Sequence, residues 1–412
     1  MGFIRVRAVV AAALAAGLLA TAALTAPARA NDGTIVFGAA LAATGSTARE
    51  GELTKEGYDF WKDYVNSHGG MKVGGKTYKV DIKYYDDESK PQTAALLVEK
   101  LVNEDHVNFI LGPYGSANTA TAAAVAERLK VPMVEGNGAA ASIFSQGYRY
   151  TFGVLAPGFK YLQGILEMAR TLKPAPKTIA IATANDTFSV EVGQGAADYA
   201  AAHGFTVVYH DKYPADTTDV SAVVSAIKAV NPDIILNGGH LDEALLLQRT
   251  FKEQDVNAKI FGYSVGPDTP DYRKVLGKDA NWVFNGTQWS PTARYQGAPG
   301  FITDSKVYAA QFEKKYGFIP EYHNAESTAA CLAFMYAIEK AGSLDPEKVR
   351  DALQNLDVVT FYGILKFDSR GLNVYKPMAV NQIQDGKLMT VWPVGVQNAK
   401  PMYPTPPWSA RT

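Results

Sequence analysis

Short apolar runs that end in glycine, each followed by a stretch with helical spacing, recur along most of the chain. The clearest case is the run Val107–Leu111, which Gly112 ends. Such a run predicts a buried parallel strand, and glycine stops regular structure. Ser116 then occupies a helix N-cap position before the alanine-rich segment Ala117–Leu129. Strand–helix alternation of this kind predicts a parallel sheet with helices on both faces.

The alternation restarts near Tyr150–Pro157, so the chain holds two units built on the same plan. In the first unit, helix Val98–Asn103 precedes strand Val107–Leu111 and a glycine loop. In the second unit, helix Val223–Val230 precedes strand Asp233–Leu236 and another glycine loop. The length of the chain also favours two domains. We therefore expect an α/β fold of two doubly wound, parallel-sheet lobes.

Residues 1–30 have the features of a secretory signal peptide. Arg5 and Arg7 give a basic start, Ala8–Leu24 is apolar, and Ala28–Ala30 is a small-x-small cleavage site. We expect cleavage before Asn31 and a mature protein in the periplasm or outside the cell. An uncleaved membrane anchor is the alternative, and the alanine-rich composition of the apolar run disfavours it.

The charge argues against a nucleic-acid-binding protein, and the cysteine content argues against a protein stabilised by disulfides. The formal net charge is −1, and the signal peptide would remove three arginines and no acidic residue. This balance gives no indication of a nucleic-acid partner. Cys331 is the only cysteine, so no intrachain disulfide can form. An exported domain of this size must then be stabilised by its core, which its length permits.

Candidate binding residues gather at the expected strand exits. Ligands of open α/β sheets bind beyond the carboxyl ends of the strands, and two facing lobes would place these ends around one cleft. The hydroxyl of Ser116 and the free N–H groups of a helix start suit a carboxylate. An ordinary capped turn explains the same residues if they are taken alone. The candidate walls are Arg49, Tyr114 to Ser116 and Gly138 to Ala140 in the first lobe, and Asn185 to Phe188, His240 and Ser264 in the second.

Two motifs resemble sites of other classes. The segment Gly136–Ala141 fits the dinucleotide fingerprint, but it does not open the first βα unit and no acidic residue follows at the required distance. The segment Gly262–Gly266 spells a hydrolase nucleophile elbow around Ser264, with Asp304 and His323 downstream, but prolines delay the helix that the elbow needs. A serine esterase therefore stays a minor alternative. The histidines show no metal-ligand spacing, and we expect neither a metal nor a cofactor.

Four segments in order carry a family likeness. They are Phe37-Gly38-Ala39-Ala40 with Gly45, Asn66–Gly70, Asp86–Pro91, and Leu111-Gly112-Pro113 with Ser116. Together, and behind a signal peptide, they resemble the periplasmic leucine/isoleucine/valine-type (type I) substrate-binding proteins of ABC importers. The resemblance spans essentially the whole mature chain. It implies two lobes that close on a ligand about a hinge of three crossovers.

The resemblance also implies boundaries for the lobes. The crossovers would lie near Gly153, Asn285 and Thr360. The first lobe would then comprise residues 31–153 and 286–360, and the second lobe residues 154–285 and 361–412.

Roles for individual residues follow from the same resemblance. Ser116 and nearby backbone amides would hold the carboxylate of the ligand. The family's threonine, its second-lobe aromatic residue and its tyrosine fall at Ala139, Phe188 and His240. Arg49 could add a bidentate contact to the carboxylate.

Ser264 departs from the family pattern. In the amino-acid binders a carboxylate near this position pairs with the ligand's ammonium group, and serine cannot do so. Unless Asp268 or Glu135 reaches the site, the sequence predicts a carboxylate ligand without an α-amino group. Flat side chains at Tyr114 and Phe188 then favour an aromatic acid. A hydrophobic amino acid is the second candidate.

The resemblance finally implies a function. We expect a monomeric, non-enzymatic binding protein that delivers a small acid to the membrane permease of an ABC importer. A ligand-sensing receptor module of the same fold is the alternative.

Overall fold

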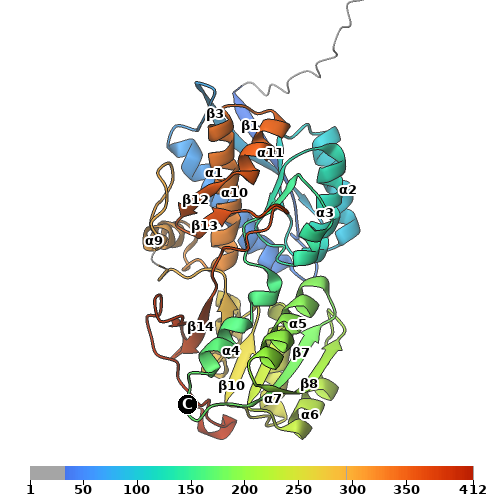
Figure 1. Cartoon of the computed structure of the whole chain (residues 1–412), viewed down its shortest axis with the longest axis vertical. Coiled ribbons are helices and arrows are strands. Elements are labelled where there is room, and N and C mark those ends of the chain that lie inside the picture. The colour runs from blue at the N-terminus through green and yellow to red at the C-terminus, as the bar shows by residue number, and fades with distance from the viewer. Residues whose placement is uncertain (1–32, 294, 412) are drawn as a thin grey trace, which may run out of the picture.

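The computed structural model describes residues 33–293 and 295–411, which form two α/β lobes stacked along the long axis of the molecule (Figure 1). The expected signal peptide, residues 1–30, lies outside the described residues.

The first lobe is built on a sheet with the strand order β2-β3-β1-β4-β5-β6. Its strands are β1 (Thr34–Leu41), β2 (Met71–Val73), β3 (Lys76–Asp86), β4 (Phe109–Leu111), β5 (Met133–Glu135) and β6 (Thr151–Gly153). Neighbouring strands are parallel, except that β2 pairs with β3 in an antiparallel hairpin.

Side chains of β4 alternate between two helical layers. Phe109 and Leu111 belong to the hydrophobic cluster of Trp61, on α1, whereas Ile110 belongs to that of Leu101, on α2. The helices of the first layer are α1 (Ala48–Ser67) and α10 (Tyr322–Ala341), and those of the second are α2 (Pro91–Asn103) and α3 (Ser116–Leu129). Successive strand residues point to opposite faces, so an entirely apolar strand is the expected pattern for a sheet covered on both sides.

The turn from β4 into α3 depends on glycine. A Cβ on Gly112 would lie 2.8 Å from the Cα of Glu135 in the neighbouring strand. Gly115 stands just before α3 with a φ of 83°, a backbone conformation that other residues rarely adopt. The chain can therefore leave the sheet here and start a helix at Ser116.

The second lobe repeats the plan with the strand order β15-β14-β11-β10-β9-β7-β8. Its strands are β7 (Thr178–Ala184), β8 (Thr206–Tyr213), β9 (Ile234–Gly238), β10 (Ile260–Tyr263), β11 (Phe284–Thr287), β14 (Ala379–Gln384) and β15 (Lys387–Trp392). Strands β7 to β11 run parallel, and β14 and β15 add an antiparallel edge. The helices are α4 (Gln163–Ala169), α5 (Thr187–Ala202), α6 (Ser221–Val230), α7 (Leu241–Glu253) and α8 (Pro270–Leu276).

After β11 the chain returns to the first lobe. This part comprises α9 (Ser305–Tyr316), α10, α11 (Pro346–Gln354) and the hairpin of β12 (Asp357–Thr360) and β13 (Gly363–Lys366). Helix α10 is buried without interruption from Tyr322 to Met335 and packs on α1, where a Cβ on Gly57 would lie 2.7 Å from the Cβ of Ser327. Short 3₁₀ helices occur in connections at Ala141–Ser145, Gly158–Lys160, Gly277–Ala280 and Trp408–Ala410.

The third crossover lies later than the sequence indicated. Strand β13 pairs with β12, and Leu372 bridges to Gly153 at the end of β6. The chain enters the second sheet only at Ala379. The expected crossover near Thr360 and the assignment of residues 361–372 to the second lobe are therefore wrong. The reason is packing: the ring of Phe361 stacks on Tyr308 of α9 at 3.9 Å.

Side chains tie the three crossovers together. Gln288 accepts a hydrogen bond from the N–H of Ala156 and donates one to its carbonyl oxygen, both at 3.0 Å. Asn373 donates to the carbonyl oxygen of Val154 at 3.1 Å. Lys376 donates from Nζ to the carbonyl oxygen of Gln288 at 2.8 Å. The hinge is thus a connected unit.

Candidate functional site

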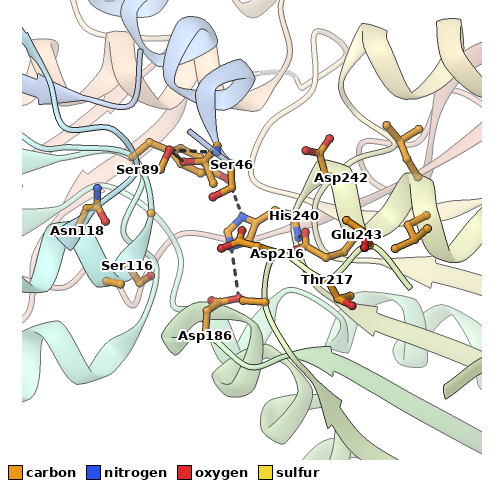
Figure 2. A pocket seen from close by; sticks show the side chains of 18 of the residues that line it. Ser46, Ser89, Ser116, Asn118, Asp186, Asp216, Thr217, His240, Asp242 and Glu243 are labelled. Atoms are coloured by element: carbon orange, nitrogen blue, oxygen red, sulfur yellow. Dashed lines mark hydrogen bonds and ion pairs between the residues drawn. The ribbon is translucent and has the colours of Figure 1, made fainter. Parts of the chain in front are cut away.

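A cavity of about 540 Å³ lies between the two lobes. Figure 2 shows Ser116 and Asn118 of α3 on one side and Asp186 and His240 on the other. Residues of both lobes therefore form one site, at the carboxyl ends of their strands, as the sequence predicts for this fold.

A second, much smaller cavity of about 10 Å³ adjoins the first and shares three lining residues with it, Tyr114, Gly115 and His240. A space of this size holds about one water molecule. Its other lining residues are Asn137, Ala139, Tyr161, Phe188, Val265, Tyr322, His323 and Glu326. We call the two spaces the outer and the inner cavity.

Ser116 is the first residue of α3 and lines the outer cavity. It is only 2 % exposed, and its Oγ accepts a hydrogen bond from the N–H of Ala140 at 3.1 Å. Because Oγ is the acceptor in this bond, its own hydrogen can still be donated to another acceptor. Ala140 thus acts through its backbone on Ser116, while Ala139 lines the inner cavity.

His240 connects the two lobes. Its Nδ1 lies 3.0 Å from the Tyr114 hydroxyl, and its Nε2 lies 3.6 Å from Oδ2 of Asp186. Burial lowers the pKa of His240, but the carboxylates of Asp186, Glu243 and Glu50 outweigh burial and raise that pKa to about 10. The imidazole is therefore an imidazolium at neutral pH.

Asp186 shows the reciprocal effect. Burial raises its pKa, but the charge of His240 and hydrogen bonds from Ser189 outweigh burial and lower the pKa to about 2. The ring of Phe188 lies 5.5 Å from that of His240 and 5.0 Å from that of Tyr161. The site thus combines a fixed ion pair with an aromatic wall.

Ser264 and Arg49, two of the predicted site residues, line neither cavity. The Ser264 hydroxyl donates to the carbonyl oxygen of Gly239 at 2.9 Å and accepts from its N–H at 3.0 Å. Arg49 pairs with Asp271 of α8 at 2.6 Å and with Glu52 at 2.7 Å. Ser264 therefore shapes the loop before His240, and Arg49 joins the two lobes beside the site.

The residues of the esterase alternative are engaged elsewhere. Asp304 caps α9 by accepting from the N–H groups of Lys306 and Val307. His323 pairs through Nδ1 with Glu321 at 2.9 Å. With Ser264 bonded to Gly239, these three residues do not form a nucleophile, base and orienting acid.

The segment Gly136–Ala141, which resembles the dinucleotide fingerprint, also has backbone N–H groups that are bonded within the protein. The N–H groups of Asn137 and Gly138 donate to the buried carboxyl of Glu135. Burial raises the pKa of Glu135 to about 8. Asp268, the other acid considered for the site, accepts from Asn381 at 2.8 Å. Neither acid lines the two cavities.

The sequence did not single out Glu50 of α1 or Glu326 of α10 as site residues. Glu50 is 2 % exposed and accepts from the N–H of Leu241 across the cleft at 3.2 Å. Glu326 and His323 of α10 line the inner cavity. Helix α10 follows the second crossover, and its burial on nearly all sides gives these polar residues no face that periodicity could distinguish.

Comparison with known proteins places the chain in a family. A model of the periplasmic binding protein family matches residues 34–387. The chain belongs to this family. The resemblance drawn from its sequence is thereby confirmed, and the two cavities occupy the cleft of a periplasmic binding protein.

Relatives and solved structures are similar to this chain over most of its length. The Leu/Ile/Val-binding protein homolog 8 of Brucella abortus (strain 2308) is 26 % identical over 385 residues, which cover 89 % of this chain and 92 % of the relative. A branched-chain amino acid transporter substrate-binding protein, LivJ of Streptococcus pneumoniae, solved with isoleucine, superposes with a TM-score of 0.75 at 20 % identity, covering 86 % of this chain and 97 % of LivJ.

A third similar protein carries a different ligand. The ABC-transporter solute-binding protein of R. palustris, solved with benzoate, superposes with a TM-score of 0.74 at 16 % identity, covering 87 % of this chain and 96 % of that protein. The structural likenesses establish the two-lobed type I fold of this periplasmic binding protein.

Among the described residues, no helix has the length and apolarity needed to cross a membrane. No group of three or more histidine, cysteine, aspartate or glutamate side chains in that part of the chain is arranged to hold a metal ion.

Proposed function

We propose that this periplasmic binding protein is the extracytoplasmic solute-binding component of an ABC importer. It works in the periplasm as a monomer without a cofactor, and it hands its ligand to a membrane permease. It performs no chemistry on that ligand. The family membership supports the class, and the secretory features of residues 1–30 support export.

The ligand is a small carboxylate held in the cleft between the lobes. One observation carries this proposal: Ser116, buried at the start of α3, presents its hydroxyl and the helix N-terminus to the cavity. The positive end of a helix dipole and free N–H groups favour an anion. Tyr114, Phe188 and His240 supply flat surfaces around it.

Two ligand classes compete. The serine at position 264 favours an aromatic acid without an amino group, and a solute-binding protein of the same fold has been solved with benzoate. A hydrophobic amino acid is the second class, and LivJ has been solved with isoleucine.

The test is ligand-induced thermal stabilisation of residues 31–412 after unfolding and refolding to remove any carried ligand. The panel comprises leucine, valine, phenylalanine, benzoate, hydroxybenzoate and hydroxycinnamate. A ligand at a hundred times its dissociation constant stabilises by about 2.7 kcal/mol, which raises the melting temperature by several degrees.

The matched variants are Ser116→Ala and Ser221→Ala. Both serines start a helix, but Ser221 is exposed and lines neither cavity. Ser116→Ala should weaken the best ligand by about 1–3 kcal/mol, whereas Ser221→Ala should leave affinity unchanged. Equal affinity of Ser116→Ala and the unmodified protein would contradict the proposed site.

A further inference from the structure

Glu326 of α10 is a buried acid that faces the inner cavity. It is 1 % exposed and lines that cavity, and its Oε2 has no hydrogen-bond partner among the described residues. A buried carboxylate without a partner is costly, because it loses hydration and gains nothing in return. This position therefore has a physical reason to receive a positively charged group.

The neighbouring lysine does not neutralise Glu326. Lys376 forms no ion pair within 4.0 Å among the described residues, and its Nζ donates instead to the carbonyl oxygens of Gln288 and Tyr362 at 2.8 and 3.0 Å. Burial also lowers the pKa of Lys376 to about 7, so that its positive charge is incomplete at neutral pH. Glu326 thus forms no ion pair with Lys376, the lysine of the crossover segment next to it.

The other buried acids around the cleft have partners. Asp186 accepts from two backbone N–H groups at the start of α5 and faces His240. Glu243 accepts from the N–H of His240, Glu50 from that of Leu241, and Glu321 pairs with His323. Of the acids that line a cavity, Glu326 is the buried one left open toward a ligand.

The two ends of the site have opposite polarity. Gly115 lines both cavities, and the anion-binding start of α3 follows it directly. Glu326 lies on α10, which lines the inner cavity from the first lobe. A ligand whose carboxylate lies at Ser116 can therefore extend along Tyr114 toward Glu326.

The geometry points to Glu326 as the specificity-determining residue that pairs with a protonated amino group of the ligand. This inference rests on the proposed function and chooses between its ligand classes: the ligand carries both a carboxylate and a cationic nitrogen.

A proton should leave when such a ligand binds. Burial, together with the charges of Glu321 and Glu135, raises the pKa of Glu326 well above its usual value, against the opposing influence of Lys376 and Tyr362. Tyr114, Tyr161 and Tyr322 also surround it and stay neutral, since burial raises their pKa values. The raised pKa favours the protonated form of Glu326 in the empty site, whereas a bound ammonium group favours the ionised form, so that binding should release a proton.

The experiment compares amino acids with their amine-free counterparts by titration calorimetry at pH 7. The pairs are leucine with 4-methylpentanoate and phenylalanine with 3-phenylpropanoate. We expect the unmodified protein to bind one amino acid at least tenfold more tightly than its counterpart. Titration in two buffers of different ionisation enthalpy should show release of about one proton for the amino acid only.

The isosteric variant Glu326→Gln should remove most of that preference and the proton release, while the affinity for the amine-free acid changes less than threefold. Tyr362→Phe is the control, because it alters a neighbour of Glu326 without changing its charge. If Glu326→Gln does not fold, the proton release of the unmodified protein still decides.

Three outcomes overturn the inference. A preference for the amine-free acids, or amino acid binding without proton release, excludes a charge pair at Glu326. An unchanged preference in folded Glu326→Gln excludes this residue as its source. Binding of none of the acids, with Ser116→Ala no different from the unmodified protein, is instead a failure of the proposed function itself.

Discussion

The phenol oxygen of Tyr114 lies 3.0 Å from Nδ1 of His240, and this contact joins the lobes across the cleft. Tyr114 follows β4 of the first lobe, whereas His240 stands at the N-cap of α7 in the second. Because His240 is an imidazolium, Nδ1 donates to the tyrosine oxygen, and the Tyr114 hydroxyl hydrogen remains free for a ligand. The two lobes are therefore joined at the candidate site by a contact that separation of the lobes would break.

Tyr114→Phe should weaken ligand binding without unfolding the protein. The variant loses one hydrogen bond that exists only in the closed cleft, worth about 0.5–1.5 kcal/mol, so the dissociation constant should rise up to about tenfold. Calorimetric titration measures this change. Tyr263→Phe is the control: its hydroxyl bonds Gln248 within the second lobe, and its loss should lower stability while leaving affinity unaltered.

The His240–Asp186 pair should make stability depend on pH. The pKa of His240 is raised from 6.5 to about 10 in the folded protein. Its stabilisation is therefore fully present below pH 6.5, as far down as Asp186 stays ionised, and is lost as the pH rises toward 10. The pKa of Asp186 is lowered to about 2, so the acid limb of the same pair is lost as the pH falls from 3.8 to about 2.

The measurement is urea unfolding of the unmodified protein and of His240→Gln at several pH values. The difference in unfolding free energy should shrink between pH 6.5 and 10. The two proteins must be compared because Lys376 also titrates in this range. The pKa of Lys376 is lowered from 10.5 to about 7, so its contribution to stability changes with pH in the opposite direction and cancels only in the difference between the two proteins. His203→Gln, at an exposed histidine, should show no such trend. A pH-independent difference for His240→Gln would contradict the ion pair.

The sequence could predict the strands, the turn at Gly112 and, to within one residue, the start of α3, because local rules decide them. The predicted N-cap role of Ser116 is wrong: Gly115 is the N-cap, without a side-chain cap bond, and Ser116 is the first residue of the helix. Apolar runs, glycine and an N-cap residue carry their signal within a few positions. The position of the third crossover could not be predicted by such local rules. Whether Phe361 stays with the first lobe is decided by its packing on Tyr308, a residue far away in the chain.

The candidate site residues divide in the same way: some are predictable from their local position, and others depend on contacts with distant parts of the chain. Ser116, Tyr114 and His240 are predicted site residues because they lie at strand exits, and all three line the outer cavity. Arg49 and Ser264 satisfy the same criterion, yet each is bonded to partners that only the folded chain brings near. Glu326 sits inside an apolar helix, and no pattern in the sequence indicates that it faces a cavity.

Gly112→Ala should destabilise the first lobe. The added Cβ would meet Cα and Cβ of Glu135, which the adjoining strand holds in place. Overpacking of this kind costs about 1–3 kcal/mol. Thermal unfolding measures the loss. The control is Gly395→Ala, since a Cβ there meets no atom within 4 Å. Equal melting temperatures of the two variants would show that β4 and β5 can separate.

The Arg49–Asp271 ion pair should act on cleft closure rather than on folding. It joins α1 of the first lobe to α8 of the second at 2.6 Å, and both side chains are partly exposed, at 27 % and 35 %. Exposed pairs contribute about 0–1 kcal/mol, and this pair would break if the lobes separated. Asp271→Asn should therefore speed ligand dissociation up to about fivefold and leave the melting temperature of the ligand-free protein nearly unchanged.

Stopped-flow dissociation of Asp271→Asn, Arg49→Met and the double variant measures the coupling between the two residues. The matched pair is Lys252 with Asp279, which also lies at 2.6 Å but within the second lobe. Asp279→Asn should leave the dissociation rate unchanged, because domain closure does not alter that contact. Additive effects of Arg49→Met and Asp271→Asn would show that the ion pair does not hold the cleft closed, and the contacts of Tyr114 and Glu50 would then be the bonds that do.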